Sequence, residues 1–521
     1  MNSATREQQV KAEETTATSS TPPFPPEGST TEHTLRIEET TLSYQAKTAW
    51  LTLRRIHKPI AHVFHTAYVA DAPSPSRPLT FVFNGGPGAA SAFLHMGALG
   101  PQRVAFDVQG TIPKPPAQIQ DNLETWLAFT DLVFIDPLGT GFSRAIREEP
   151  SAPSPSSSSN GGNSSEAPHE NTDFWEIERD LQSLGDFMCR YLSQHHRWTS
   201  PLFIAGESYG GFRVAKMARK LQEEHGIGLS GALLISPAIE FDGIFGSDYN
   251  LTHWIELFPS LVATAFQHGV ARLPETATTV EDAYQQAIQF ATSELASLLV
   301  SGESLPDAKR SEIFATMSAM TGLPQDMVVR SGGRLDTNTF CRELLREKRQ
   351  FCGRYDGSVT AVDPFPDRTD YAGPDPTLFS IDRLFTAAIN DQLRHRLHLQ
   401  TDLDYRLLSM DVFKDWKDST ADHVFRKVVG AMDDLRYGMS LNEHMRVFIS
   451  HGYFDLITPS FSSQRLVEHM KLTDSQRQQL LLRNYPGGHM FYSWDESRTA
   501  FRDDATAFYA DACAATQLAS T

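Results

Sequence analysis

The sequence predicts an α/β fold with a mostly parallel central sheet and a helical cap insertion. First, short continuous apolar runs alternate with helical patterns before residue 242 and return after residue 438. Such runs are typical of parallel strands that helices cover on both faces. Second, the stretch between them, 242–438, loses this strand pattern and is helical and loop-like. A long insertion between strands of one sheet indicates a cap over their carboxyl ends, where ligands bind in such folds.

The bulk composition is that of a globular protein without a polyanionic partner. The chain has 521 residues, of which 40% are hydrophobic and 21% are charged, and this is enough for a large core. The formal net charge of −18 argues against nucleic acid as the main partner, because neutralising phosphates requires basic patches. No stretch approaches the roughly 20 apolar residues that span a bilayer, so we expect no membrane partner.

The N-terminal stretch and the cysteines bear on location. Residues 1–33 are rich in Thr, Ser, Pro and Glu, so we expect a disordered tail. They contain no apolar segment of the kind found in secretory signals. The four cysteines are too few to indicate a disulfide framework. Cys341 and Cys352 are close enough in sequence to pair, but we expect reduced thiols and a cytoplasmic location.

The predicted core occupies 34–241 and 439–521. It opens with alternating β-type sequence, "TLRIEETTLSYQAKTAWLTL" and "HVFHTAYVA". Apolar runs then predict buried strands at 79–83, 132–136, 202–205, 231–236, 445–452 and 479–485. Amphipathic patterns predict helices at 174–194, 212–224 and 497–515. A low-complexity stretch, 147–171, is expected to be a surface loop.

The pentapeptide "GESYG", with Ser208 at its centre, lies between a predicted strand and a predicted helix. It could be an ordinary surface turn, since a G-x-S-x-G match alone is weak. The flanking strand and helix are the context of a nucleophile elbow, in which one serine is held in strained backbone geometry. Glycines are needed beside it because side chains there would collide with the neighbouring strand and helix. We therefore predict that Ser208 is a nucleophile.

Two later residues are candidate partners for Ser208. In folds of this kind the acid and the histidine follow the serine in that order. Asp455 follows the strand "RVFIS", and His489 follows the last predicted strand and two glycines. Each residue alone has an ordinary explanation, as a turn aspartate or a solvated histidine. Their order and their places at strand ends point to a triad, with His489 as the base and Asp455 as the group that orients it.

A glycine-rich turn, "NGGPG" at 84–88, directly follows another predicted strand. Such a turn can present backbone N–H groups to a developing oxyanion without obstruction by side chains. The candidate donors are the N–H groups of Gly86 and of Tyr209, the residue after the nucleophile. An ordinary turn or a phosphate loop is the alternative, but no Lys-Ser/Thr pair follows at the spacing of a phosphate loop. This chemistry needs no cofactor and no metal.

Four motifs together resemble the serine carboxypeptidase family, peptidase family S10. They are "NGGPG", "DPLGTGFS", "GESYGG" and the pair "HGYFD" and "GGHM", and they occur in order over about 34–515. The resemblance implies an α/β-hydrolase fold with a helical cap and supports the triad and oxyanion assignments. Carried over by motif, Asn84, Gly85 and Glu207 are implied to bind the free carboxylate of the substrate.

The sequence departs from the family pattern at two places. The family usually has a cysteine and a serine after N-G-G-P-G, where this chain has "AAS", so the disulfide expected there is absent. The family also has a glutamate just before a Leu-Gly-Pro, whereas this chain has Met96, Gly97 and Ala98. Glu207 then lacks an acidic partner to share a proton with. The departure places carboxypeptidase specificity in more doubt than the triad chemistry.

Three functions follow from these residues. The first is a carboxypeptidase that hydrolyses C-terminal peptide bonds through an acyl-enzyme on Ser208. The second is an esterase or acyltransferase that uses the same triad. The third is an inactive binding protein, against which the full set of triad and oxyanion residues argues. The expected partner is a peptide or a small acyl substrate, and the sequence carries no signal for oligomeric state.

Overall fold

The protein is described by a computed structural model that covers 24–71, 76–146, 172–368, 375–418 and 429–517. Residues 1–23 of the expected tail and the whole low-complexity stretch 147–171 lie outside the described residues. The expected tail ends earlier than the sequence suggested. The first strand, β1 (Ser29–Ile37), already pairs Ser29 with Thr48 and His33 with Tyr44. The prediction of disorder up to residue 33 was therefore wrong for 29–33, because these residues gain backbone hydrogen bonds from a neighbouring strand.

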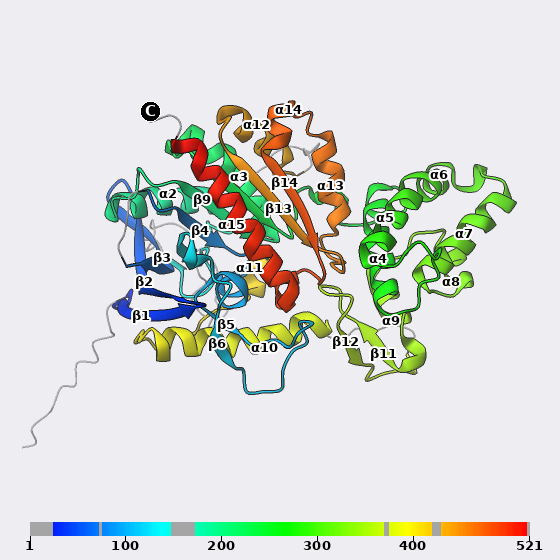
Figure 1. The fold of residues 1–521 in the computed structure, drawn as a ribbon, viewed down its shortest axis with the longest axis horizontal. Coiled ribbons are helices and arrows are strands. Elements are labelled where there is room, and N and C mark those ends of the chain that lie inside the picture. Colours follow the sequence, from blue (N-terminus) through cyan, green and yellow to red (C-terminus); the bar gives the residue numbers. More distant parts are fainter. Residues whose placement is uncertain (1–23, 72–75, 147–171, 369–374, 419–428, 518–521) are drawn as a thin grey trace, which may run out of the picture.

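In the described part of the chain, a mixed sheet of ten strands forms the centre of the molecule (Figure 1). In spatial order it contains β1, β2 (Thr40–Arg55), β3 (Lys58–Ala70), β7 (Asp131–Ile135), β4 (Leu79–Phe83), β9 (Leu202–Glu207), β10 (Gly231–Ile235), β13 (Arg446–Gly452) and β14 (Leu480–Tyr485), and β8 (Arg144–Ala145) pairs with β3. From β7 to β14 all neighbours are parallel, while β1, β2, β3 and β7 pair antiparallel. The predicted fold class is confirmed.

Four central strands are buried along their whole length, whereas β14, which was also predicted to be buried, is mostly half-buried because it lies at the edge of the sheet. Every residue of β4, β7, β9 and β10 is buried, as continuous apolar runs predict for strands that are covered on both faces. One face packs on α2 (Ile177–Gln194), α3 (Tyr209–His225) and α12 (Met432–Leu441). The other packs on α1 (Ala92–Leu94), α10 (Pro376–Asp391) and α15 (Asp495–Gln517). Short pieces complete the core: β5 (Gln102–Val104), β6 (Ile119–Asp121), α13 (Ser460–His469) and α14 (Asp474–Gln478).

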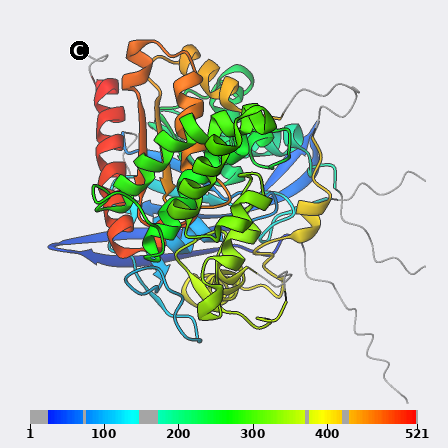
Figure 2. The ribbon, with the colours of Figure 1, turned by 90° about the vertical axis from the view of Figure 1, so that its right-hand side faces the viewer.

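A helical lobe with its own apolar cluster stands beside this core. It contains α4 (Thr252–Gln267), α5 (Val280–Phe290), α6 (Ala296–Ser301), α7 (Asp307–Thr321), α8 (Gln325–Arg330), α9 (Thr337–Glu343) and the hairpin of β11 (Gln350–Cys352) and β12 (Thr360–Val362). Figure 2 looks onto the lobe, whose green helices lie in front of the core. The lobe is therefore built from the first part of the expected cap insertion.

The second part of that insertion packs on the core. Ile381 and Phe385 of α10 belong to one core cluster, and Leu435 and Met439 of α12 belong to the other. Figure 1 shows α10 running below the sheet, with one end beside the lobe hairpin. The connecting helix α11 (Met410–Lys414) also lies outside the lobe cluster. The stretch 242–438 thus divides into a lobe and segments that complete the core.

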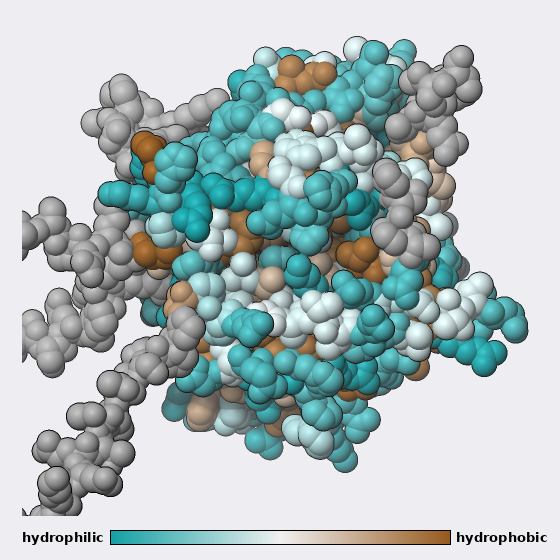
Figure 3. All heavy atoms as spheres, turned by 90° about the vertical axis from the view of Figure 1, so that its left-hand side faces the viewer, coloured by the Kyte–Doolittle hydropathy of each residue, from teal (hydrophilic) through white to brown (hydrophobic). Residues whose placement is uncertain are grey.

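The face of the molecule at the β1 side of the sheet is mainly polar. On the face at the β1 side of the sheet, most visible atoms are hydrophilic and apolar atoms form small separate patches (Figure 3).

A helix that crosses a membrane needs about 20 apolar residues. None of the helices in the described part of the chain has both that length and that apolar character.

Candidate active site

Ser208 occupies the sharp turn between β9 and α3. Its backbone has φ of 61° and ψ of −124°, a conformation that costs free energy for any residue with a side chain. The turn is held by the Ser208 N–H, which donates to the Ile235 carbonyl (2.9 Å), and by the N–H of Ala238, which donates to the Ser208 carbonyl (3.1 Å). The structure thus places the predicted nucleophile in the backbone geometry of an elbow.

The glycines on either side of Ser208 are required by close packing. A Cβ on Gly206 would lie 2.2 Å from the Gly210 carbonyl oxygen, and a Cβ on Gly210 would lie 2.7 Å from the Phe83 oxygen. These neighbours are backbone atoms that cannot move aside. The reason proposed from the sequence for both glycines therefore agrees with the geometry.

Asp455 and His489 form a buried ion pair. His489 Nδ1 lies 2.7 Å from Asp455 Oδ2. The other carboxylate oxygen, Asp455 Oδ1, accepts hydrogen bonds from the N–H groups of Ile457 (2.8 Å) and Thr458 (3.0 Å). The Thr458 hydroxyl lies 2.7 Å from Asp455 Oδ2. The carboxylate is therefore fixed on both sides, as expected for a group that orients an imidazole.

The strand β10 links this pair to Ser208. Its last residue, Ile235, accepts the N–H of Ser208, and the next residue, Ser236, donates its hydroxyl to the His489 carbonyl (2.7 Å). The Thr458 hydroxyl lies 3.0 Å from the Ser236 carbonyl oxygen. Because β9, β10, β13 and β14 are parallel neighbours, the loops after them meet at one edge of the sheet. The structure therefore places the turn that carries Ser208 at the same edge of the sheet as the Asp455–His489 pair.

The hairpin of the lobe holds the histidine loop in place. The Tyr355 carbonyl accepts the N–H of His489 (2.5 Å), and Asp356 Oδ2 accepts the N–H of Gly488 (3.0 Å). Gly487 has a φ of 119°, and a Cβ on Gly488 would lie 2.3 Å from the Tyr355 oxygen. Both glycines are thus needed for the inward bend. Sequence reasoning missed Tyr355 and Asp356, which lie in a stretch without a recognisable motif.

Electrostatics favour a charged imidazole at this position. Burial lowers the pKa of His489, but the Asp455 carboxylate, with a smaller contribution from Glu207, more than offsets it, so the pKa is raised above its ordinary value. An imidazole that readily takes up a proton suits a general base. The carboxylate beside it stabilises the cation that forms.

The predicted oxyanion turn packs directly on the elbow. A Cβ on Gly85 would lie 2.4 Å from the Tyr209 nitrogen, and Gly86 has a φ of 99°. Among the described residues, neither the Gly86 N–H nor the Tyr209 N–H donates to another group of the protein. Both donors are thus free for an oxyanion.

Two buried ionisable residues support the oxyanion turn. Arg213, on α3, donates to the Asn84 carbonyl (2.6 Å) and forms an ion pair with the buried Asp180 (2.7 Å). Asp136, from the "DPLGTGFS" motif, accepts the N–H of Ser91 (3.0 Å) and the hydroxyl of Tyr405 (3.0 Å). Burial raises the pKa of Asp136 to about 7. Asp136 of the "DPLGTGFS" motif therefore holds the residues that follow the oxyanion turn.

Glu207, the residue before the nucleophile, is buried among neutral partners. Its Oε2 accepts the side-chain N–H of Asn84, and its Oε1 accepts the hydroxyl of Tyr492 (2.7 Å). Burial raises the pKa of Glu207 to about 7, against the opposing effects of His489 and of these hydrogen bonds. The ring of Tyr492 lies against Gly97, where a Cβ would come within 2.8 Å of Tyr492 Cε2. Sequence reasoning missed Tyr492, although it is only three residues after His489.

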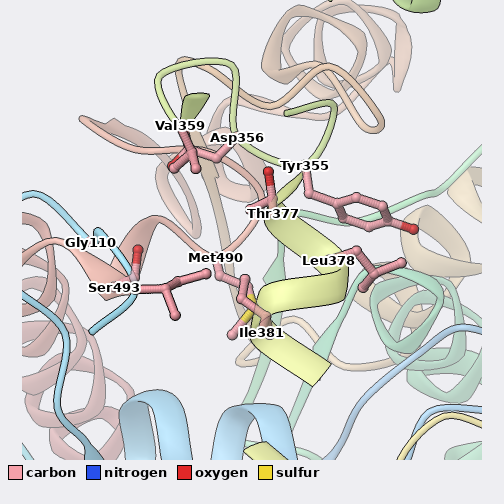
Figure 4. A pocket seen from close by; sticks show the side chains of 10 residues that line it. Gly110, Tyr355, Asp356, Val359, Thr377, Leu378, Ile381, Met490 and Ser493 are labelled. Carbon is pink, nitrogen blue, oxygen red and sulfur yellow. The ribbon is translucent and has the colours of Figure 1, made fainter. Parts of the chain in front are cut away.

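A small cavity adjoins the histidine loop. Figure 4 shows its walls, which come from the lobe hairpin, the first turns of α10, the residues that follow His489 and the loop that contains Gly110. Its volume is ≈ 20 Å³, which is room for about one water molecule. Tyr355, Leu378, Ile381 and Met490 give it a mainly apolar lining. The cavity as it stands therefore cannot hold a substrate side chain.

Comparisons with known proteins show the family to which the chain is similar. The family model described as serine carboxypeptidase matches residues 39–490. Over 165 residues the chain is 27% identical to the pheromone-processing carboxypeptidase KEX1 of Yarrowia lipolytica, and this match covers 30% of the chain and 21% of that relative. The chain thus matches about a fifth of the relative's length. The crystal structure of KEX1(delta)p, a prohormone-processing carboxypeptidase from Saccharomyces cerevisiae, shares the fold with a TM-score of 0.52 at 15% identity, covering 90% of this chain and 92% of that one.

Proposed function

Because the chain belongs to the serine carboxypeptidase family, we propose that it hydrolyses C-terminal peptide bonds through an acyl-enzyme on Ser208. The observation that carries this proposal is the buried Asp455–His489 pair beside a strained serine elbow. The free N–H groups of Gly86 and Tyr209 support the same chemistry. A peptide with a free C-terminus is the proposed substrate.

Each residue has a distinct part in the proposed reaction. The Ser208 hydroxyl attacks the scissile carbonyl while His489 takes its proton. The N–H groups of Gly86 and Tyr209 stabilise the oxyanion that develops. His489 then gives the proton to the departing amine, and a water molecule activated by the same imidazole releases the acyl group. Asp455 keeps the imidazole in the tautomer that this sequence requires.

The substrate's free carboxylate is proposed to meet Asn84, Gly85 and Glu207. Glu207 can donate a hydrogen bond to a carboxylate only while it is protonated. When ionised, it repels the carboxylate. Burial makes its protonated form prevail below about pH 7, so no second carboxyl is needed to hold that proton. This observation favours recognition of a free C-terminus at acidic pH.

An esterase or acyltransferase is the second candidate, favoured by the neutral hydrogen-bond partners of Glu207. Its only side-chain hydrogen-bond partners among the described residues are Asn84 and Tyr492, and neither carries a positive charge to attract a carboxylate. At neutral and alkaline pH, where Glu207 is ionised, substrates without a free carboxylate then react better. Both candidates use the same acyl-enzyme.

We expect the preference for a free C-terminus to disappear as pH rises. The test compares kcat/KM for a blocked dipeptide with that for its C-terminal amide and ester from pH 5 to pH 9. Because ionised Glu207 repels a carboxylate, the value for the free acid should fall about tenfold per pH unit above the pKa of Glu207, near 7. The values for the amide and the ester should rise to a plateau as His489 loses its proton.

Glu207→Gln is the matched control for this experiment, because a glutamine stays neutral at every pH. We expect it to remove the alkaline fall for the free acid, while the amide profile should keep its shape and move slightly to lower pH, because the Glu207 charge contributes to the raised pKa of His489. A strong preference for the free acid that persists at pH 9 in the unmodified protein would contradict this account of carboxylate binding. Hydrolysis of the ester alone, at any pH, would select the second candidate.

The cysteines lead to a proposal about location. The four cysteines are unpaired, and burial raises the pKa of the Cys352 thiol to about 12 and that of Cys341 above its ordinary value. Reduced thiols are the usual state in a reducing compartment, so we propose a cytoplasmic location. Cys341 and Cys352 should be inert in the folded protein, because thiolates are the reactive form.

Alkylation without reductant tests this proposal on protein from its native source. We expect mass increments for four thiols after denaturation, and slow or no modification of Cys341 and Cys352 before it. A mass that shows only two reactive thiols after denaturation, with the other two recovered by reductant, would demonstrate a disulfide. That result would contradict the cytoplasmic location.

A further inference from the structure

We propose that Tyr492 is a positioning residue for substrate recognition: its hydroxyl controls the single proton with which Glu207 recognises the C-terminal carboxylate. This inference rests on the proposed function and names a residue that determines its substrate range. Tyr492 is fully buried, and its hydroxyl donates to Glu207 Oε1 at 2.7 Å. Glu207 directly precedes the nucleophile, so a change in its charge acts at the reacting end of the substrate.

The structure holds the Tyr492 ring in one place. Gly97 leaves no side chain beside the ring, and a Cβ there would lie 2.8 Å from Tyr492 Cε2 and 3.2 Å from Phe385 Cζ. The Tyr492 carbonyl accepts a hydrogen bond from the buried Arg498 (3.2 Å). The ring therefore fills the space that a side chain at position 97 would need, and it delivers a hydroxyl to Glu207.

A phenol in this position acts differently from a second carboxyl. Burial keeps the Tyr492 hydroxyl protonated, since it raises the pKa of that group well above its ordinary value. The pair of Glu207 and Tyr492 then has one exchangeable proton across the neutral range, whereas two adjacent carboxyls titrate in two coupled steps. Glu207 passes from a neutral acid to a carboxylate in one step.

The groups that face Glu207 determine whether removal of the Tyr492 hydroxyl raises or lowers the pKa of Glu207. Burial is the largest influence and favours the neutral acid, and Asp455 adds to it slightly. His489, Tyr492 and Asn84 act against it, because a positive charge and two donors stabilise the carboxylate. Removing the Tyr492 hydroxyl removes one donor, so Glu207 should keep its proton to a higher pH. Loss of the hydrogen bond from Tyr492 to Glu207 should thus extend to higher pH the range in which peptides with a free C-terminal carboxylate are substrates.

The test uses Tyr492→Phe in the full chain. We expect the alkaline fall of kcat/KM for a blocked dipeptide free acid to move up by about one pH unit, the order of shift for one donor to a carboxylate. The profile of the corresponding amide should not move. Tyr485→Phe is the matched control: Tyr485 is another buried tyrosine, and its hydroxyl donates to the Asp504 carboxylate (2.6 Å) away from Glu207. It should move neither profile.

A second measurement does not depend on hydrolysis. The carbonyl band of a protonated carboxyl, assigned by its loss in Glu207→Gln, is followed by infrared spectroscopy against pH in the unmodified protein and in Tyr492→Phe. Its midpoint should rise by the same amount in the variant. Gly97→Ala should also raise the midpoint of this band, because its Cβ displaces the Tyr492 ring. This variant keeps the test available if Tyr492→Phe does not fold.

The outcomes separate this inference from the proposed function. The inference is overturned if the infrared midpoint does not shift in either folded variant. It is also overturned if kcat/KM falls equally for the free acid and the amide and neither pH profile shifts. Tyr492 would then be a packing residue. A raised midpoint in a protein that hydrolyses neither substrate would support control of the proton by Tyr492 and reject peptidase activity.

Discussion

Ser208→Ala is expected to lower kcat for peptide hydrolysis by about 10⁶-fold, the order seen when a triad nucleophile is removed. The hydroxyl forms the acyl-enzyme, and no other group in the elbow can replace it, because Glu207 and Tyr209 point their side chains to other partners. Binding should survive, since the backbone at position 208 can be kept by alanine. KM should therefore change far less than kcat.

The same substitution can be followed by covalent labelling. A fluorophosphonate probe should modify one serine in the unmodified protein, and peptide mass mapping should place it at Ser208. Ser440→Ala, which changes an exposed serine on α12, is the control and should label normally. Labelling that survives in Ser208→Ala would show that the elbow assignment is wrong.

Asp455→Asn is expected to lower kcat by about 10⁴-fold, because it reverses the tautomer of His489. Asp455 Oδ1 accepts two backbone N–H groups, from Ile457 and Thr458. An asparagine must keep its oxygen towards these donors, so its NH₂ group faces His489 Nδ1 in place of Oδ2. Nδ1 then has to accept, Nε2 carries the proton, and the imidazole cannot take a proton from Ser208.

His489→Ala should lower kcat about as much as Ser208→Ala, since the two residues act as a unit. The double variant should be no slower than either single variant. His469→Ala, which removes an exposed histidine at the end of α13, is the matched control and should keep full activity. Near-full activity in Asp455→Asn would mean that the orienting acid lies elsewhere in the site.

Local patterns in the sequence were sufficient to predict the sheet and the candidate triad. The apolar runs at 79–83, 202–205 and 231–236 became buried parallel strands, because continuous burial imposes a continuous apolar pattern. In a parallel sheet the carboxyl ends of strands share one edge. Placing Ser208, Asp455 and His489 after strands therefore predicted their proximity without any knowledge of the packing.

Only the tertiary structure decided what surrounds these residues. Tyr492 and Glu207 are 285 positions apart, and Asp356 reaches the histidine loop from a separate lobe. No local pattern encodes such contacts. The helices α10 and α12 likewise share the helical character of the lobe but bury their apolar faces on the core.

The sequence by itself determined the order of the catalytic groups and the absence of a second carboxyl at Gly97 and Ala98. It could not determine the protonation of Glu207, because the free energy of ionising a carboxyl depends on how completely water is removed from it. That removal is produced by the packing of Asn84, Tyr492 and their neighbours around it. The candidate catalytic residues were therefore encoded by local patterns, whereas the protonation of Glu207 depends on burial, which is a property of the whole fold.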